Sequence, residues 1–218
     1  MFSAVSTKYN NRPYSLEDIS SAIFSAVTVK AGNYLVYCPS FEYQRMIMGS
    51  FMSYLERQVK KPQLKVIGQS RGMSEKERNE FLDSFLVTRN EFLVGFAVLG
   101  GVFGEGIDLT GESLSGVVLV GVGLPAKSFE QDILMDYFDN SFGKGFDYAY
   151  KYPGFNKILQ AAGRVIRTET DKGFILLVDE RYARQDYKEL FPVEWDPVYV
   201  SSAEEISKEL NGFFDIRS

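Results

Sequence analysis

Residues 160–178 read QAAGRVIRTETDKGFILLV, in which two arginines one helical turn apart precede a continuous apolar run. The apolar run, Phe174–Val178, has the length and composition of a buried strand. The residues before it have helical spacing, and we expect one helix over 156–168. Its polar face carries residues at i, i+3, i+4 and i+7: Gln160, Gly163, Arg164 and Arg167. From these residues alone, salt bridges between helices remain an adequate explanation of the arginines.

The rest of the chain repeats this alternation of helix and strand. We expect further strands over 34–38, 64–67, 92–98 and 117–122, and further helices over 17–30, 42–59 and 128–138. Two more helices are expected to begin at Ser74 and Ser202, where Glu77 and Glu205 complete capping boxes. The last of these helices is expected to bury three apolar residues: Ile206, Leu210 and Phe213.

Strands separated by helices imply parallel pairing, because a crossover helix must return the chain to the same end of the sheet. The sequence therefore predicts an α/β fold, with three layers and a mostly parallel central sheet flanked by helices. A chain of 218 residues suits one domain, and we expect a single domain over 1–218. An insertion is expected near 126–154, where Asn140–Pro153 is rich in Gly, Phe and Tyr.

Composition excludes several kinds of chemistry. The chain has no histidine and one cysteine, Cys38, so Ser-His and Cys-His nucleophile pairs, histidine zinc sites and an internal disulfide are excluded, and we predict no metal site. The net charge of −5 argues against bulk attraction to nucleic acid. The longest apolar stretch has 11 residues, Gly116–Ala126, too few for a membrane span. We therefore expect a cytoplasmic protein without a membrane partner.

Ligands of open α/β sheets bind beyond the carboxyl ends of the strands. Three segments fall at that edge: Pro39–Ser40, the loop GGVFGEGID at 100–108, and Gly123–Pro125. Closely spaced glycines let backbone N–H groups approach an oxyanion, although tight turns of α/β proteins are often glycine-rich for structural reasons alone. The chain has no GxxxxGK[ST] phosphate-binding loop, since Val117 and Val118 follow the one similar glycine spacing.

Two ordered patterns are more specific. The first, QAxGRxIRxxxDxG followed by a strand and D-x-R-[YF], is matched from Gln160 to Tyr182. The second, EGxD followed by a strand that ends in Leu-Pro, is matched from Glu105 to Pro125. With NYLVYCPSFEYQRM at 33–46, they resemble the second (C-terminal) RecA-like motor domain of the XPD/DinG family of superfamily 2 DNA helicases. The resemblance extends over roughly residues 5–195.

This resemblance implies a RecA-like (P-loop NTPase-like) domain of an ATP-dependent helicase that moves 5′ to 3′ along single-stranded DNA. In the family, the first RecA-like domain supplies the phosphate-binding loop and makes most of the contacts to ATP and Mg²⁺. Any iron–sulfur cluster also lies outside the second domain. The first motor domain is absent from this chain, so its two implied partners are that domain and single-stranded DNA. The resemblance also implies that this chain alone is inactive.

The resemblance assigns roles to individual residues. It makes Arg167 the candidate arginine finger, with Arg164 and Gln160 as further catalytic residues. Nucleotide-binding residues would be Gly104, Glu105, Gly106, Asp108 and Gly163. Nucleic-acid contacts would be Ser40, Phe41 and Tyr43, although the two aromatic residues fit helix packing equally well.

Three structural or functional alternatives stay open. The basic residues between Arg57 and Arg71 have the pattern of a solvated face. A helicase-derived module that binds protein or nucleic acid without any ATPase partner would contain the same motifs. A doubly wound domain that binds a metabolite at its strand ends would share the fold alone.

Overall fold

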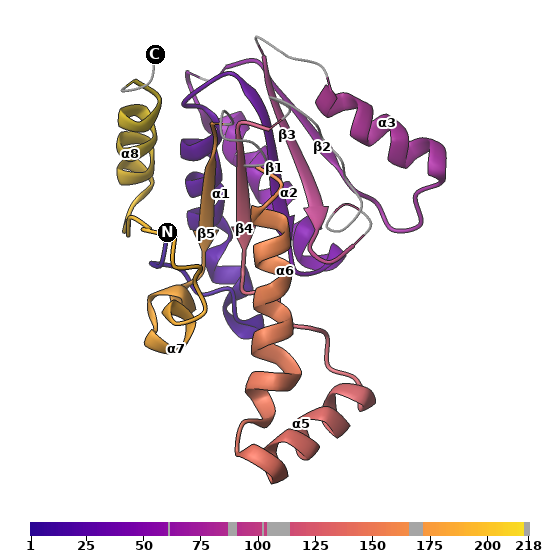
Figure 1. Cartoon of the computed structure of the whole chain (residues 1–218). Coiled ribbons are helices and arrows are strands. Elements are labelled where there is room, and N and C mark those ends of the chain that lie inside the picture. The colour runs from indigo at the N-terminus through magenta and orange to yellow at the C-terminus, as the bar shows by residue number, and fades with distance from the viewer. Residues whose placement is uncertain (61, 87–90, 102, 104–113, 166–171, 216–218) are drawn as a thin grey trace.

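A computed structural model of the chain describes residues 1–60, 62–86, 91–101, 103, 114–165 and 172–215. Its centre is a five-stranded sheet in the order β2-β3-β1-β4-β5, with all neighbouring strands parallel (Figure 1). The α/β fold predicted from the sequence is therefore confirmed. The strands are β1 (Gly32–Cys38), β2 (Leu64–Gly68), β3 (Phe92–Val98), β4 (Gly116–Val120) and β5 (Phe174–Val178).

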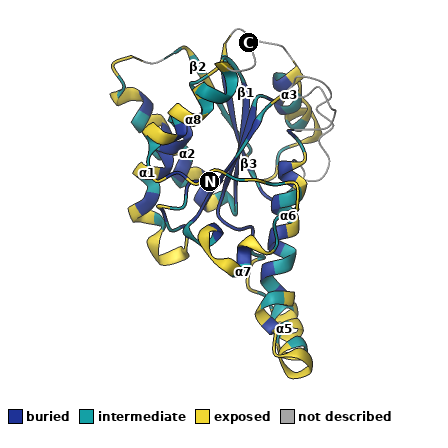
Figure 2. Cartoon of the chain, turned by 60° about the vertical axis from the view of Figure 1, so that its left-hand side comes forward, coloured by how far each residue is buried: buried dark blue, intermediate teal, exposed yellow. Residues whose placement is uncertain are grey.

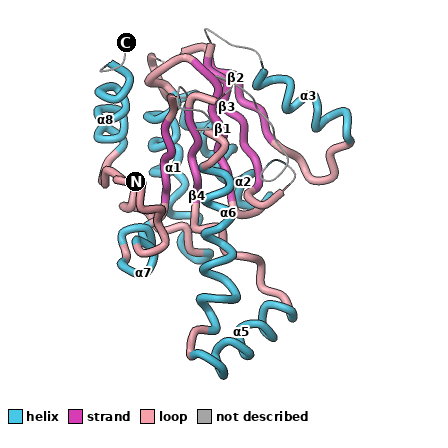
Figure 3. The backbone as a smooth tube through the Cα atoms, viewed as in Figure 1, coloured by secondary structure: helices cyan, strands magenta, loops and turns pink. Residues whose placement is uncertain are grey.

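Helices cover both faces of this sheet (Figure 3). One face packs against α1 (Arg12–Val27), α2 (Phe41–Arg57) and α8 (Ala203–Asp215). The other face packs against α3 (Glu75–Leu86), α6 (Tyr152–Ala162) and the short α7 (Gln185–Lys188). Three further short elements are η1 (Tyr9–Asn11), the π-helix η2 (Asp147–Lys151) and η3 (Glu180–Ala183). The three predicted layers are present.

The central strand explains why the sequence pattern is continuous rather than alternating. In β1, Leu35 and Tyr37 enter the core on the α6 side, whereas Tyr34 and Val36 enter the core on the α1 side. Side chains alternate between the two faces of a strand, and here both faces are buried. A parallel strand covered on both sides therefore needs apolar residues at successive positions.

Both predicted capping boxes begin helices. The Ser74 N–H donates to Glu77 Oε2 over 2.7 Å, and the Glu77 N–H donates to Ser74 Oγ over 3.3 Å. At α8 the Glu205 N–H donates to Ser202 Oγ, but the Glu205 carboxylate accepts from Ser201 rather than from Ser202. Reciprocal bonds of this kind satisfy N–H groups that have no partner within a helix.

The packing of α8 is looser than predicted. Ile206 is buried, but Leu210 and Phe213 are only half-buried. Both side chains line an open groove of about 470 Å³ between α8 and β5. The prediction that all three residues are buried is therefore wrong for two of them, because the edge of the sheet leaves that groove beside the helix.

The helix α5 (Phe129–Phe142) and the start of the α6 region project from the body of the domain as an arm (Figures 1 and 2). None of the residues of α5 is buried. The stretch Asn140–Pro153 contains the end of α5, the π-helix η2 and the first residues of α6. It is therefore helical for most of its length, and its status as an insertion remains a prediction.

Among the described residues, no helix combines the length and apolar content that a bilayer crossing needs.

The α-amino group of Met1 predicts an unusual pH dependence of stability. This group donates to the Val198 carbonyl, and burial lowers its pKa from 8.0 to about 6. The unfolded chain therefore binds more protons than the folded chain between these values, so the free energy of unfolding should rise with pH, by up to about 2–3 kcal/mol. Urea unfolding of the 218-residue chain at pH 6.0, 6.75 and 7.5 should show about 1.5 kcal/mol of this rise.

Because the sequence has no histidine, no side chain has an ordinary pKa between 6 and 7.5, so the Met1 amino group is the one group expected to titrate in this pH range. The control is the same chain acetylated at Met1, whose stability should be flat over the window. An equal slope in the acetylated chain would assign the effect to other groups.

Candidate nucleotide and nucleic-acid site

The carboxyl ends of the strands meet at one edge of the sheet, as the parallel topology requires. Pro39–Ser40 follows β1, Gly100–Gly101 follows β3, and Gly123–Pro125 follows the turn after β4. The prediction that these segments share an edge is confirmed for the described residues. Four predicted nucleotide-binding residues of the loop after β3 lie outside the described residues: Gly104, Glu105, Gly106 and Asp108.

A close backbone contact positions α6 at this edge. Gly123 has φ +68°, and a Cβ atom there would lie 2.5 Å from the Gly154 carbonyl oxygen. A Cβ atom on Gly154 would in turn lie 2.9 Å from the Val122 carbonyl oxygen. Because real Cβ contacts are never this short, only glycine fits at both positions, and the start of α6 is fixed against the turn after β4.

The helix that carries the arginine motif is shorter than predicted. It ends at Ala162 rather than at residue 168. Beyond this point the N–H groups of Arg164 and Val165 donate to Ala161 and Ala162, the i→i−3 spacing of a tightened last turn. Val165 turns into the core, and its Cγ1 leaves no room for a side chain at Gly173. Val165 and Gly173 thus pack together just before β5, which begins at Phe174.

The prediction that one α-helical face carries the whole motif is therefore wrong at its C-terminal end. Gln160 and Gly163 are exposed, and Arg164 is half-buried. A Cβ atom on Gly163 would contact only carbonyl oxygens of its own helix, at 3.4 and 3.7 Å, so the described part of the domain leaves this glycine uncovered. Arg167 lies outside the described residues. The roles proposed for these four residues remain predictions.

Lys157 is a candidate that the sequence motifs did not indicate. It lies on α6 three residues before Gln160, so both residues share a helical face. Its side chain lies over the loop after β3, where a Cβ atom on Gly100 would be 3.0 Å from Lys157 Cδ and 3.4 Å from Nζ. The signal available in the sequence was this i, i+3 spacing within the motif helix. It brings a positive charge to the glycine-rich loop.

At the start of α2 the three predicted nucleic-acid residues have different surroundings. Ser40 caps the helix, with its Oγ accepting from the Tyr43 N–H over 3.2 Å. Phe41 is partly exposed, and the Arg71 guanidinium lies 5.6 Å from its ring centre. Arg71 is exposed, as expected of a solvated face, and this contact places it beside a candidate stacking residue.

Tyr43 is the clear correction among these residues. Its side chain is fully buried, and the Arg12 guanidinium covers its ring at 4.4 Å from the centre. Burial raises the pKa of its phenol. A ring enclosed in this way has no face open to a base, so Tyr43 is a packing residue of α1 and α2 and not a nucleic-acid contact.

Two glutamines, Gln44 and Gln69, connect the start of α2 to the ends of β2 and β3. Gln44 Nε2 donates to the carbonyl oxygens of Gln69 and Phe96, over 2.9 and 3.0 Å. Gln69 Oε1 accepts from the Val98 N–H over 2.8 Å. These bonds join α2 to the ends of β2 and β3, so the segment that carries Arg71 is held close to the start of α2.

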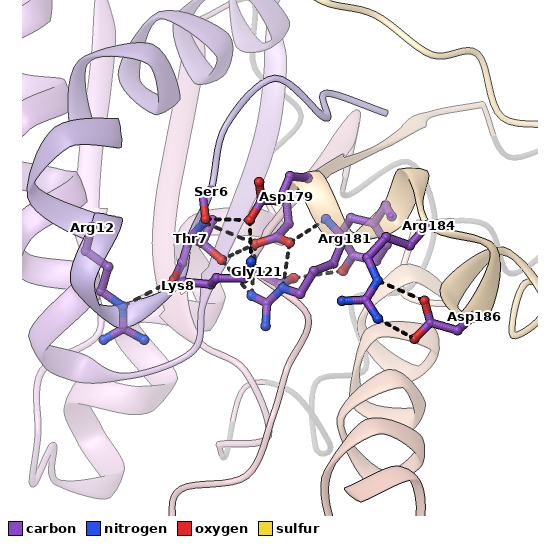
Figure 4. Close-up of polar contacts among 11 residues, drawn as sticks. Ser6, Thr7, Lys8, Arg12, Gly121, Asp179, Arg181, Arg184 and Asp186 are labelled. Carbon is purple, nitrogen blue, oxygen red and sulfur yellow. Dashed lines mark hydrogen bonds and ion pairs between the residues drawn. The ribbon is translucent and has the colours of Figure 1, made fainter.

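The residues that match D-x-R-Y form a buried polar lock (Figure 4). Asp179 is fully buried and accepts from Thr7 Oγ1, from the Arg181 N–H at 2.8 Å and from Arg181 Nε at 2.7 Å. Burial opposes its charge, but the hydrogen bonds and positive charge of Arg181 outweigh burial and lower the pKa of Asp179. Tyr182 donates to the Gly121 carbonyl over 2.7 Å. The lock joins the N-terminal segment, the turn after β4 and the end of β5.

A family model described as the helicase C-terminal domain matches residues 23–198. The chain belongs to this family. The "Probable ATP-dependent helicase MJ0942" of Methanocaldococcus jannaschii is 32% identical over 164 residues, which are 70% of this chain and 24% of that protein. The "ATP-dependent DNA helicase DDX11" of Danio rerio is 27% identical over 199 residues, 84% of this chain and 22% of that protein.

A solved structure of the XPD helicase matches the fold with a TM-score of 0.67 and 22% identity, over 91% of this chain and 34% of that chain. The RecA-like fold and the resemblance to XPD/DinG helicases are thus confirmed. The chain spans about a quarter of the length of the two relatives named above.

The buried lock predicts a large loss of stability when its acid is neutralised. Asp179→Asn would leave Arg181, whose side chain is only 13% exposed, without its charged partner. We expect a loss of about 3–5 kcal/mol in the free energy of unfolding, measured by urea denaturation. Glu17→Gln is the matched control, because the Glu17–Arg57 pair is 61% and 54% exposed and should be worth less than about 1 kcal/mol. Equal losses in both variants would contradict the lock.

Proposed function

We propose that this chain is the second motor domain of an ATP-dependent DNA helicase and completes an ATP site that a first motor domain begins. The observation that supports this most directly is the uncovered end of α6, where Gln160 and Gly163 are exposed beside the carboxyl edge of the sheet. The named relatives are helicases of about three to four times its length, which leaves ample chain for another motor domain. The arm at 126–154 is then an insertion in this domain.

In this proposal Arg167 and Arg164 face the γ-phosphate of ATP held on the first domain. A guanidinium keeps its charge and binds phosphate oxygens through two parallel N–H groups, so it neutralises the charge that develops during phosphoryl transfer. Gln160 would orient the attacking water or sense the phosphate, and Gly163 would let the opposing backbone approach. Gly104, Glu105, Gly106 and Asp108 would contact the nucleotide or orient the arginines.

The ATP is proposed to bind with Mg²⁺, whose ligands belong to the first domain. Among the described residues, no three acidic or cysteine side chains lie together as a metal site. This chain would therefore supply transition-state charge, while the partner domain would supply the phosphate cradle.

Single-stranded DNA is the proposed polymer substrate, with movement from 5′ to 3′. Ser40 and Phe41 would contact it at the start of α2, with Arg71 and Lys157 as nearby positive charges that suit phosphates. An exposed aromatic face can stack on any base, which fits a motor that reads no sequence. Because the net charge is −5, the proposed DNA contact depends on these local positive charges rather than on bulk attraction.

If the ATP site is divided between two domains, Arg167 should affect ATP hydrolysis only when a partner domain is present. The 218-residue chain alone should show negligible ATP hydrolysis. In a protein that joins it to a domain with a phosphate-binding loop, Arg167→Ala should lower kcat by about 10³–10⁵-fold, measured as phosphate release with single-stranded DNA present. Arg57→Ala, which changes an exposed arginine paired with Glu17 on α1, should leave kcat unchanged. Robust turnover by the chain alone, abolished by Arg167→Ala, would contradict the proposal.

Phe41 gives a test of the DNA contact. In the joined protein, Phe41→Ala should weaken binding to labelled oligothymidine by about 1–3 kcal/mol, or roughly 5- to 150-fold, because a stacking face is lost. Phe41→Tyr keeps the ring and should keep most of the affinity, whereas Phe41→Leu keeps the bulk and should not. Fluorescence anisotropy at fixed salt measures all three. Equal affinity in the Leu and Tyr variants would reduce Phe41 to a packing residue.

A further inference from the structure

Among the described residues, the edge strand β5 has backbone partners on its outer side at its C-terminal end. There the Phe2 N–H donates to the Leu177 carbonyl over 2.8 Å, and the Asp179 N–H donates to the Phe2 carbonyl over 3.2 Å. Phe2 thus pairs with Val178 in parallel, and also with Val200 on its other side. The N-terminal residues therefore begin a short sixth strand of the sheet, beside β5 in Figure 1.

The register of Phe2 against β5 determines which backbone groups of β5 a preceding residue would meet. Leu177 and Asp179 direct their backbone groups toward Phe2, whereas Phe174 and Val178 direct theirs toward β4 and the turn after it. Backbone groups alternate in direction along a strand. Ile175 and Gly173 therefore present their polar groups to the outer edge. A residue placed before Met1, parallel to β5, would meet Leu177 N–H and the Ile175 carbonyl.

That outer edge forms one wall of the groove of about 470 Å³ beside α8. The other walls are mostly apolar, and the acidic residues Asp196 and Glu209 also line the groove. The apolar lining side chains come from the segment 195–200 and from α8: Trp195, Pro197, Val198, Val200, Ile206, Leu210 and Phe213. The site combines backbone partners for a strand with an apolar surface for alternate side chains, the two features that strand addition uses.

The α-amino group of Met1 stands at the start of this path. It is buried and donates to the Val198 carbonyl. This bond continues the pairing of Phe2 with Val200, in which the Val200 N–H donates to the Met1 carbonyl over 2.9 Å. A peptide N–H in the same place would make the same bond without bringing a charge into an apolar surrounding. The position therefore suits a residue within a chain better than it suits an ammonium group.

We propose that the groove receives an extended polypeptide segment joined to Met1, which adds a sixth strand parallel to β5. Phe2 packs in the core on the α8 side, so the first and third residues before Met1 would direct their side chains to that face. These two residues should be apolar, and the second should be polar or basic. The inference rests on the proposed function only in that the domain works covalently joined to another part of a helicase.

The test uses the full chain with four residues added before Met1. One chain carries Thr-Val-Lys-Val, with valine at the first and third positions before Met1. Its matched control carries Val-Lys-Val-Thr, which has the same composition shifted by one position, and a second control carries Gly-Ser-Gly-Ser. Amide hydrogen exchange is measured at Leu177 and Ile175. We expect at least about tenfold slower exchange of both amides with Thr-Val-Lys-Val than with either control, since each would gain a strand partner.

Two further measurements decide between occupants. Leu210→Lys in the chain with Thr-Val-Lys-Val should return both amides to the control rate, because it places a charge in the groove that holds the valines. Equal exchange in the three extended chains would overturn the proposal. Protection that appears only at high protein concentration, together with a dimeric mass, would assign the groove to a second copy and also overturn it. Neither result involves ATP or DNA, so a failure here is distinct from a failure of the arginine experiment.

Discussion

The structure depends on one constraint: a parallel sheet that is buried on both faces. Leu35 and Tyr37 of β1 enter one core while Tyr34 and Val36 enter the other, so neither face is open to a ligand. A ligand can therefore reach the sheet only at its edges. The carboxyl edge collects the segments after β1, β3 and β4, together with the exposed end of α6. The lateral edge along β5 holds the apolar groove. The candidate site and the inferred docking path thus have the same structural origin.

Such an edge must also be held together, and the chain does this with buried polar contacts. Asp179 at the end of β5 binds Thr7 and Arg181, while Tyr182 binds the carbonyl of Gly121. On the other side of the sheet, Gln44 and Gln69 join α2 to the ends of β2 and β3. A buried carboxylate without its arginine is costly, so the lock favours one arrangement of these segments over looser ones. The residues of D-x-R-Y are therefore positioning residues in this domain.

The sequence predicted the sheet and its helices because these depend on local patterns. Apolar runs, helical spacing and capping boxes each involve a few neighbouring residues, and the Ser74–Glu77 box formed as expected. The end of α6 was not predictable in this way. The polar periodicity continues to Arg167, but Val165 packs into the core against Gly173, eight positions later, and helical spacing does not encode this contact.

The same limit explains Tyr43 and Lys157. Tyr43 follows a strand end in the sequence, where an aromatic residue suits nucleic acid, but its ring is covered by Arg12, 31 positions away along the chain. The i, i+3 spacing of Lys157 from Gln160 is present in the sequence, but its contact with Gly100, which belongs to another loop, cannot be derived from spacing. Roles that depend on a contact between distant segments are invisible to a reading of spacing, whereas the order of the two motifs was enough to identify the family.

The residue types of this chain fit the proposed division of the ATP site between two domains. Without histidine, and with its one cysteine buried in the core, its reactive groups are carboxylates, lysines, hydroxyls and guanidinium groups. Guanidinium groups stabilise negative charge but do not hold Mg²⁺ or activate water by accepting a proton. The sequence also lacks a GxxxxGK[ST] phosphate-binding loop, so in the proposed function this domain adds positive charge to a nucleotide that another domain binds. In the proposed function, the exposed Gly163 and Gln160 leave room for that second surface.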